Sequence, residues 1–233
     1  VASISKVVVA MCAMSMADEG LIDLDAPLSD YWGSGVRNPY SEGQPSVRTL
    51  MTHTSSLRNL EITRGLSHLR GLLQRPSTWR SMEPGNGGYW YYSNFGLCVL
   101  GTTLELACGG LLENYLQEHF LQPLGASASF YSETLEAGQL AALYTTGGVG
   151  RSVAEQMAQT TPTQIGQTAS YFPRGVTASA YGVFALMTYN PETRNGVVVL
   201  TTGAPRNTDD RGLYALCADL SEKLYEKMDG DPV

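Results

Sequence analysis

The chain opens with Val1-Ala2-Ser3-Ile4-Ser5-Lys6, and an apolar run, Val7 to Ala17, leads from there to Asp18-Glu19-Gly20. The run is rich in Val, Ala and Met and has almost no polar face. It therefore predicts a helix over residues 4–19 that is buried on most sides. Gly20 is a candidate C-cap, because glycine readily adopts the left-handed conformation in which many helices end.

Ser3 and Lys6 form an S-x-x-K pair. Three residues is just under one helical turn, so both side chains leave the same face of a helix. A buried lysine loses its proton more easily than a solvated one, and it can then accept the proton of a serine hydroxyl. Free N–H groups in the first turn also suit the oxygen of an acyl intermediate. Alone the pair is weak evidence, because an N-cap serine followed by a solvated lysine has the same spacing.

Composition describes a chain that can bury a substantial core. Of its 233 residues, 43% are hydrophobic, which suits one large domain or two interleaved ones. The net charge is −7 and no basic stretch is present to neutralise phosphates, which argues against a nucleic-acid partner. No apolar run approaches the ~20 residues of a transmembrane span. No signal peptide is visible, and because the chain opens just before a candidate nucleophile we expect its natural beginning to be missing.

The cysteines do not indicate a metal site. All four lie in apolar segments that are typical of helices: Cys12, Cys98, Cys108 and Cys217. They show no C-x-x-C spacing and do not cluster with the three histidines, so we predict no metal and no cofactor. Buried free thiols are the expected state, with one disulfide as the alternative.

The middle of the chain is predicted to be mainly helical. After the first helix, patterns of apolar residues and turn signals indicate further helices at 46–51, 67–74, 95–107 and 111–121. His53 lies just after one of them, where a structural histidine is more common than a catalytic base. Between residues 126 and 175 no periodicity persists.

The end of the chain combines a hairpin with a helix. Two β-rich runs, Ala180 to Tyr189 and Val197 to Thr202, are joined by a turn and predict an antiparallel pair. The last helix is expected at about Arg211 to Met228. Its apolar stripe consists of Leu213, Leu216, Leu220 and Leu224.

These elements predict a mixed α/β (α+β) fold, with an antiparallel sheet flanked by helices and an inserted, mainly helical region. Residues 1–20 and 170–233 are expected to form the sheet-and-helix part, with the nucleophile helix at the interface. Residues 21–169 are expected to form the helical part, which carries the Tyr-x-Asn motif. Since a hairpin alone is marginally stable, we expect further strands, in residues before Val1.

Five motifs in this order resemble one known family. They are Ser3-x-x-Lys6, Gly20-Leu21-Ile22-Asp23-Leu24-Asp25-Ala26-Pro27-Leu28, Leu50-Met51-Thr52-His53-Thr54-Ser55, Tyr92-Ser93-Asn94-Phe95-Gly96 and Gln122-Pro123-Leu124-Gly125. Together they resemble the serine β-lactamase and penicillin-binding-protein-like family, in its class C β-lactamase and esterase branch. The resemblance covers most of the chain and implies a β-lactamase/transpeptidase-like fold without its N-terminal strands. It also implies a periplasmic, secreted or cell-envelope location.

The resemblance implies a role for each matching residue. Ser3 would be the acylated nucleophile and Lys6 its hydrogen-bonded partner. Tyr92 would move the proton of Ser3 and later activate the deacylating water, while Asn94 would hold the substrate and orient Lys6. Because tyrosine titrates near pH ~10, Tyr92 needs a nearby positive charge such as Lys6 to act as a base. The alternative for Tyr92 is an aromatic core residue.

The third motif of the family departs from its usual pattern. It is normally Lys-Thr-Gly or His-Thr-Gly on a strand that lines the site, and the best match is in the segment 175–182. Thr177 is retained, but Val176 replaces the cationic or polar residue and Ala178 replaces the glycine. A backbone N–H near Ser179 can still complete an oxyanion hole with that of Ser3. Thr177 and Ser179 are therefore the candidate substrate-binding residues here, and binding of a substrate carboxylate is expected to be weakened.

The leading hypothesis is a serine hydrolase that forms an acyl-enzyme on Ser3 with a β-lactam, an ester or a D-amino-acid amide. The esterase, D-aminopeptidase and DD-carboxypeptidase types all fit, and slow penicillin acylation or ester hydrolysis is favoured over efficient β-lactamase action. Its partners are small-molecule or peptide substrates with a reactive carbonyl. The alternative is a catalytically weak or inactive relative that binds cell-wall peptide or a partner. An α/β-hydrolase is disfavoured because no G-x-S-x-G elbow is present.

Overall fold

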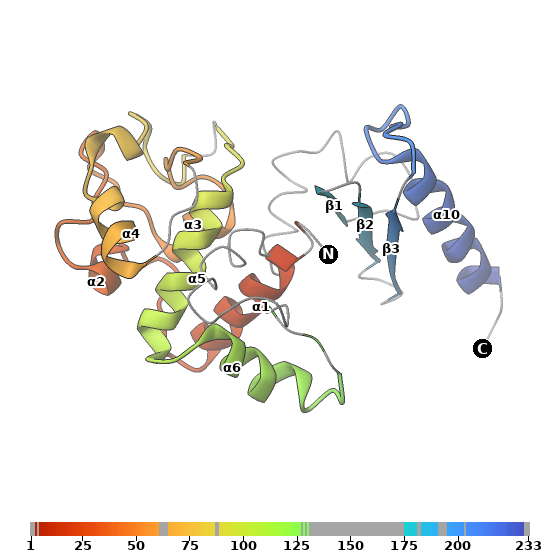
Figure 1. The fold of residues 1–233 in the computed structure, drawn as a ribbon, viewed down its shortest axis with the longest axis horizontal. Coiled ribbons are helices and arrows are strands. Elements are labelled where there is room, and N and C mark those ends of the chain that lie inside the picture. Colours follow the sequence, from red (N-terminus) through yellow and green to blue (C-terminus); the bar gives the residue numbers. More distant parts are fainter. Residues whose placement is uncertain are drawn as a thin grey trace. The chain divides into compact units, whose positions relative to one another are not determined.

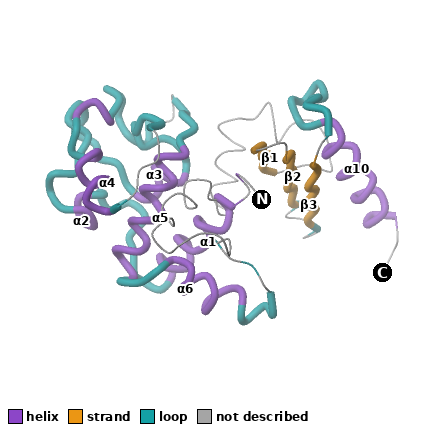
Figure 2. The backbone as a smooth tube through the Cα atoms, viewed as in Figure 1, coloured by secondary structure: helices purple, strands orange, loops and turns teal. Residues whose placement is uncertain are grey.

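The computed structural model describes residues 3, 5–60, 65–86, 89–126, 128, 130, 175–180, 183–190, 195–202 and 204–230. Two compact units make up the chain. We call Val8–Gly150 the helical unit and Val1–Val7 with Arg151–Val233 the sheet unit (Figures 1 and 2). The division predicted from the sequence, 1–20 with 170–233 against 21–169, stays a prediction because residues 131–174 lie outside the described ranges.

The predicted helices of the first half are present, each within one or two residues of its expected bounds. The helical elements of this half are α1 (Ser5–Asp18), α2 (Ser29–Trp32), α3 (Val47–Met51), α4 (Leu66–Leu73), η2 (Pro76–Thr78), α5 (Asn94–Cys108), α6 (Leu112–Leu116) and η3 (Gln117–Leu121). Two of them, α2 and η2, are short and were not predicted. The last predicted helix is divided, because α6 continues into one turn of π-helix, η3. The described residues between α1 and residue 126 are thus mainly helical, as predicted.

Helix α1 is the buried helix that the opening stretch predicts. Its side chains at Val9, Ala10, Cys12, Ala13 and Met16 are fully buried. The N–H of Gly20 donates to the carbonyl of Ala17 at 3.0 Å, and the N–H of Leu21 donates to that of Met16 at 2.8 Å. With the Gly20 φ angle at 73°, these bonds form a Schellman motif, which confirms Gly20 as the C-cap glycine.

Helix α5 forms the centre of the helical unit. Most of its residues from Phe95 to Leu104 are buried, and it contacts both α2 and α3. Trp32 of α2 donates its indole N–H to the hydroxyl of Thr103 at 2.8 Å, which satisfies both polar groups inside this core. Within the described ranges no single helix has both the length and the apolar character to cross a membrane. Helix α5 and the α6–η3 segment pass that test only as a pair, across a bend of 79°.

The sheet unit contains a three-stranded antiparallel sheet, in the order β1 (Gly175–Ala180), β2 (Val183–Tyr189) and β3 (Gly196–Thr202). Ala185 of β2 lies opposite Ala178 of β1 and Leu200 of β3. The hairpin expected from the sequence is confirmed as β2 and β3. Its first strand is shorter than predicted, because the run from Gly175 to Ala180 forms a separate strand that pairs with β2.

Helix α10 (Ala215–Gly230) packs along β2 and β3 (Figure 1). Its buried residues join a core with side chains of both strands: Phe184, Leu186, Val197, Val199, Leu213, Cys217, Ala218 and Tyr225. The hydroxyl of Thr188 on β2 also donates to that of Tyr225 at 3.2 Å.

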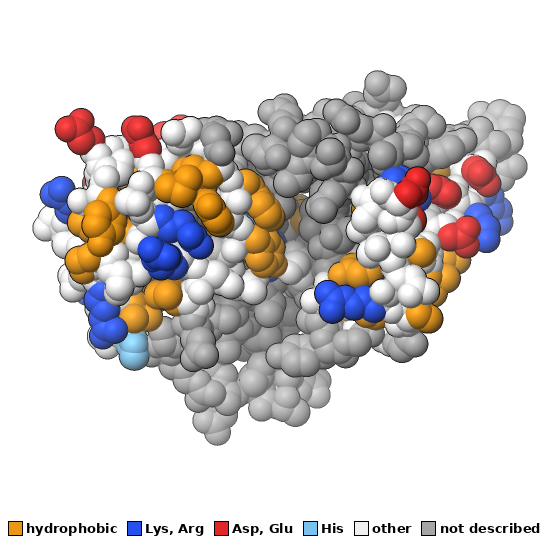
Figure 3. Space-filling model, turned by 90° about the horizontal axis from the view of Figure 1, so that it is seen from above, with side chains coloured by type: hydrophobic (Ala, Val, Ile, Leu, Met, Phe, Trp, Pro, Cys, Tyr) orange, Lys and Arg blue, Asp and Glu red, His pale blue; other side chains and the backbone are white. Residues whose placement is uncertain are grey.

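The prediction that four leucines form the buried face of this last helix is wrong, because only Leu213 is buried. Leu216, Leu220 and Leu224 are 38% to 45% exposed, and on the face shown in Figure 3 apolar side chains of this unit reach the surface beside charged ones. The helix residues that lie one position later in the sequence, beginning with Cys217, have the same spacing as the leucines, and Cys217 is fully buried. Its small side chain and the neighbouring alanine allow the helix to lie close to the sheet, and the structure buries that face instead.

All four cysteines are free thiols, as the sequence predicts, and Cys12, Cys98 and Cys217 are buried while Cys108 is partly buried. Burial raises the pKa of the Cys12 and Cys98 thiols to about 12, because the charged thiolate would lose its hydration. These thiols therefore act as small apolar side chains of the core.

Candidate active site

Ser3 and Lys6 are in direct contact at the start of α1. The Lys6 Nζ atom donates a hydrogen bond to Ser3 Oγ at 3.0 Å. The helix begins at Ser5, so the pair spans its N-terminus instead of lying within its first turn. The contact provides the arrangement that a hydroxyl needs to pass its proton to an amine.

Lys6 is buried to a degree that is rare for lysine. Its side chain is only 1% exposed, and it precedes the apolar residues of α1. Burial lowers the pKa of the Lys6 amine to about 8, because the charged form loses hydration. At pH 8 about half of the molecules would therefore hold a neutral amine that can accept a proton, compared with a negligible fraction for a solvated lysine.

The Tyr92-Ser93-Asn94 motif lies where the chain enters α5 in the helical unit. Ser93 is the N-cap, and its Oγ accepts the N–H of Gly96 at 2.9 Å. The preceding N–H, that of Phe95, donates to the side-chain oxygen of Asn59 at 3.2 Å. The motif is thus fixed to the helix by hydrogen bonds, and Asn94 is the first residue of α5.

Tyr92 is not a core residue, which excludes the alternative that its aromatic neighbours suggest. Its side chain is 38% exposed. Tyr89 of the same aromatic run is the buried one, and its hydroxyl donates to the carbonyl of Thr54 at 2.6 Å. A tyrosine at the surface beside a helix start is accessible to a substrate.

His53 positions the segment that carries Tyr92. Its Nδ1 accepts the N–H of Ser93 at 3.2 Å, and its carbonyl accepts the N–H of Tyr91 at 3.0 Å. The rings of His53 and Tyr92 also lie 4.8 Å apart between centroids. The sequence favours a structural histidine here, and these contacts agree with that reading while adding a positioning role. The sequence did mark His53, because this histidine lies in one of the motifs that carry the family resemblance. No local sequence pattern, however, indicates that His53 contacts residues 91–93.

Thr177 and Ser179 both lie on β1, so the third motif is on a strand as the resemblance implies. In the register of the sheet Thr177 is opposite Leu186 and Ser179 is opposite Phe184, and the Ser179 side chain is exposed. Among the described strands β1 is at an edge of the sheet and pairs only with β2. An edge strand presents backbone N–H and C=O groups to an extended ligand. The last two residues of the motif, 181 and 182, lie outside the described residues.

The structure thus assembles the six candidate residues as three pairs. Ser3 contacts Lys6, Tyr92 and Asn94 share the entry to α5, and Thr177 and Ser179 share β1. The first and third pairs belong to the sheet unit and the second to the helical unit.

A helical unit together with a small antiparallel sheet, and a serine–lysine pair at the start of a buried helix, define a β-lactamase/transpeptidase-like fold. The model of the Beta-lactamase family matches residues 1–185, which is most of the chain. The chain therefore belongs to the beta-lactamase family.

Individual relatives agree with this assignment. D-alanyl-D-alanine-carboxypeptidase/endopeptidase AmpH of Escherichia coli is 28% identical over 140 residues, which are 57% of this chain and 36% of the relative. A beta-lactamase/D-alanine carboxypeptidase from Yersinia pestis, crystallised with citrate, superposes with a TM-score of 0.72 at 17% identity, over 98% of this chain and 83% of that one. A class C beta lactamase from Rhodobacter sphaeroides gives 0.64 at 18% identity, over 96% of this chain and 84% of that one. The chain spans about a third of the length of the Escherichia coli relative.

Proposed function

We propose that this chain is a serine hydrolase that forms an acyl-enzyme on Ser3. The observation that carries the proposal is the 3.0 Å hydrogen bond between Ser3 Oγ and the buried amine of Lys6, whose pKa is lowered to about 8. In its neutral form this amine takes the hydroxyl proton as Ser3 Oγ attacks a substrate carbonyl carbon. The tetrahedral intermediate then expels its leaving group, which receives a proton, and the acyl group stays on Ser3.

The remaining candidate residues complete the reaction in this proposal. Backbone N–H groups of Ser3 and of β1 near Ser179 would stabilise the oxyanion. Tyr92 would move the proton between Ser3 and the leaving group and later activate the water that hydrolyses the acyl-enzyme. Asn94 and Thr177 would bind the substrate amide or ester. Exposure of Tyr92 and its fixed position at the start of α5 support this role.

The proposed substrates are peptides that end in D-amino acids and their amide, ester and β-lactam analogues. Support comes from the carboxypeptidase names of the Escherichia coli relative and the Yersinia structure. Val176, in the position of the usual cationic or polar residue, favours esters and amides over penicillins and over peptides with a free C-terminus, because both of the latter carry a carboxylate that Val176 cannot pair. A location outside the cytoplasm, in the envelope or secreted, follows from the same resemblance and is part of the proposal.

A second candidate function is binding without turnover. Val176 and Ala178 depart from the family motif on the strand that would line the site, which favours a weak or inactive relative that binds cell-wall peptide or a partner. The two candidates differ in whether Ser3 becomes covalently modified.

Intact-protein mass spectrometry distinguishes the two. The native chain is incubated with a penicillin and, separately, with an activated phosphonate ester, beside Ser3→Ala and the matched control Ser5→Ala. We expect adducts on the native chain and on Ser5→Ala, and none on Ser3→Ala. A folded native chain that neither reagent modifies would contradict the hydrolase and support the binding protein.

A further inference from the structure

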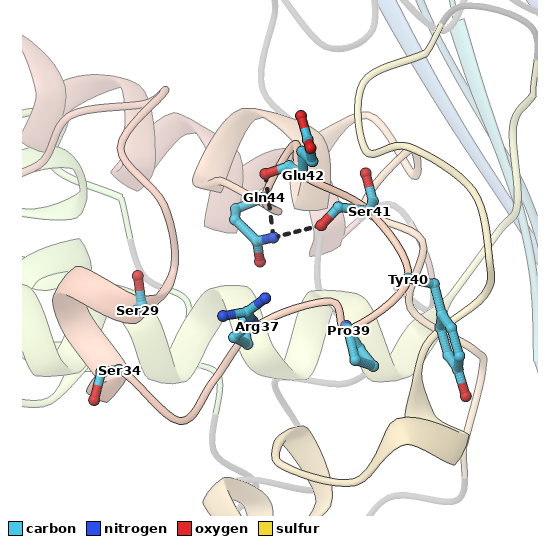
Figure 4. A pocket seen from close by; sticks show the side chains of 8 residues that line it. All are labelled: Ser29, Ser34, Arg37, Pro39, Tyr40, Ser41, Glu42 and Gln44. Atoms are coloured by element: carbon cyan, nitrogen blue, oxygen red, sulfur yellow. Dashed lines mark hydrogen bonds between the residues drawn. The ribbon is translucent and has the colours of Figure 1, made fainter.

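A polar pocket lies in the helical unit, and its lining includes none of the six candidate site residues. Its volume is about 530 Å³, and its lining residues all come from the segment between Ser29 and Gln44 (Figure 4). This volume is within the range of about 300–1,000 Å³ that is typical of small-molecule sites. The lining includes three serines, Arg37, Glu42 and Gln44, with Pro39 and Tyr40 as its apolar part.

The wall of the pocket is held in one shape by buried hydrogen bonds. Asn38 is 0% exposed, its amide N–H groups donate to the carbonyls of Arg80 and Met82 at 3.2 Å each, and its side-chain oxygen accepts the N–H of Tyr40 at 2.9 Å. Gln44 accepts the N–H of Asn38 at 2.9 Å and donates to the carbonyl of Ser41 at 2.9 Å. The last bond is drawn in Figure 4. A loop fixed in this way needs little ordering when a ligand binds, which favours affinity.

Arg37 provides the positive charge of this pocket. Figure 4 shows its guanidinium group pointing toward Gln44 across the pocket. Among the described residues the Arg37 guanidinium makes no hydrogen bond and no ion pair. Other arginines do, as Arg48 does with Asp25 at 2.7 Å. A cation with no partner among the described residues, on a chain of net charge −7, is available to an external anion.

The chemistry of the lining selects a carboxylate. A guanidinium group forms two parallel hydrogen bonds with a carboxylate, and serine hydroxyls can donate to the same oxygens. Glu42 in the lining offsets the single positive charge, so a phosphate with two negative charges would be poorly compensated. We propose that the pocket around Arg37 binds the carboxylate of a small polar ligand, an amino acid or a short peptide. Ser3 is not part of the lining, and binding at this pocket does not require acylation of Ser3.

Calorimetric titration of the full chain tests this site. Ser3→Ala serves as the parent so that no turnover occurs, and the probes are L-alanyl-L-alanine, which lacks the terminal D-amino acid of the proposed Ser3 substrates, and L-alanyl-L-alaninamide, in which an amide replaces the carboxylate. The dipeptide should bind to the parent protein. The amide should bind to it at least about tenfold more weakly, because the hydrogen-bonded charge of the carboxylate is lost. Arg37→Gln should weaken dipeptide binding by a similar factor. Arg37→Lys keeps the positive charge but lacks the planar guanidinium group, so its affinity for the dipeptide should lie between those of the parent and Arg37→Gln.

The matched control is Lys227→Gln, which makes the same change of charge at an exposed position of α10. It should bind the dipeptide like the parent. Equal binding of the dipeptide by Arg37→Gln and the parent would overturn the proposal, and so would equal binding of the two probes or no binding of either. Tighter, Arg37-dependent binding of inorganic phosphate would also overturn the assignment to a carboxylate. Because Arg37 is exposed and makes no bond to the described residues, its variants should unfold at the same temperature as the parent.

Discussion

The Nδ1 atom of His53 accepts the backbone N–H of Ser93 at 3.2 Å, and this bond joins two segments that are 40 residues apart. The φ angle of His53 is 58°, in the left-handed region, which Asn tolerates better than most residues. His53 therefore ties the loop after α3 to the start of α5, where Tyr92 and Asn94 are.

His53→Ala removes this buried acceptor and should destabilise the chain by about 1–3 kcal/mol. Because Tyr92 loses its positioning contact, acylation of Ser3 by an activated ester should also slow. His53→Asn suits the backbone conformation and retains a side-chain acceptor, so it should recover part of both losses. Urea unfolding and stopped-flow acylation measure the two effects. A positioning role would be contradicted if His53→Ala lost stability while the folded fraction acylated at the native rate.

The pH dependence of acylation should reveal the neutral form of Lys6. Since the Lys6 pKa is about 8, the acylation rate should rise as the pH increases through 8 and then level off. The measurement is the rate of phosphonate adduct formation between pH 6 and 9.5. Ser5→Ala should follow the same curve. A rate that does not change across this range would exclude Lys6 as the proton acceptor.

Stability should depend on pH through the same group. The folded pKa of Lys6, about 8, is below its unfolded value, so the unfolded state binds more protons between pH 8 and 10.5. The penalty for burying the charge is fully present below pH 8 and disappears as the pH rises through this window, by about 3 kcal/mol at most. Lys6→Met lacks the penalty.

The difference in unfolding free energy between the native chain and Lys6→Met should therefore change between pH 8 and 9.5 in favour of the native chain. Comparison with the variant cancels the opposite effect of Cys12 and Cys98, whose raised pKa values destabilise the fold at high pH. A difference that is constant over this range would show that Lys6 titrates normally. Urea titrations at three pH values suffice.

Tyr92→Phe removes one hydroxyl from an exposed ring and should leave the stability almost unchanged. If Tyr92 transfers protons, turnover of an ester substrate should fall by about 10²–10⁴-fold. Tyr91→Phe is the matched control, because Tyr91 is also exposed and precedes Tyr92 directly, with its ring under the Arg80 guanidinium. Steady-state kinetics with both variants distinguish a role of the Tyr92 hydroxyl from a general effect of the aromatic segment. Equal activities in the two variants would remove Tyr92 from the mechanism.

Val176→Lys restores a cation to the third motif on β1. Acylation by a penicillin, which carries a carboxylate, should become about tenfold faster or more, whereas acylation by an uncharged ester should change little. Val198→Lys places the same charge at an exposed position of β3 and is the control. If both variants respond alike, the gain comes from overall charge, and the alignment of Val176 with the family motif would be wrong.

Local spacing predicted the parts of the fold that depend on local contacts. The contact between Ser3 and Lys6, the burial of α1 and its end at Gly20 all involve residues within one helical turn or one continuous run. The hairpin of β2 and β3 is similar, because adjacent strands are joined by a short turn.

Contacts between distant residues were beyond the reach of such patterns. On α10, the helix face that includes Leu216 and the helix face that includes Cys217 show the same sequence period. Only packing against β2 and β3 determines that the face with Cys217 is the buried one. The bond from His53 to Ser93 and the bonds from Asn38 to Arg80 and Met82 join segments about 40 residues apart. Both the positioning of Tyr92 and the pocket around Arg37 depend on these long-range bonds.

The division of α1 between the two units has a consequence for how the protein is made. Residues Val1–Val7, with the candidate nucleophile, belong to a unit whose other part starts at Arg151. The helical unit is one continuous stretch and can fold while the ribosome is still extending the chain, because domains generally fold as units from the N-terminal side. Residues 1–7 must therefore wait until the part of the sheet unit that starts at Arg151 has been made. Any acylating activity should appear only after both parts of the sheet unit have been translated.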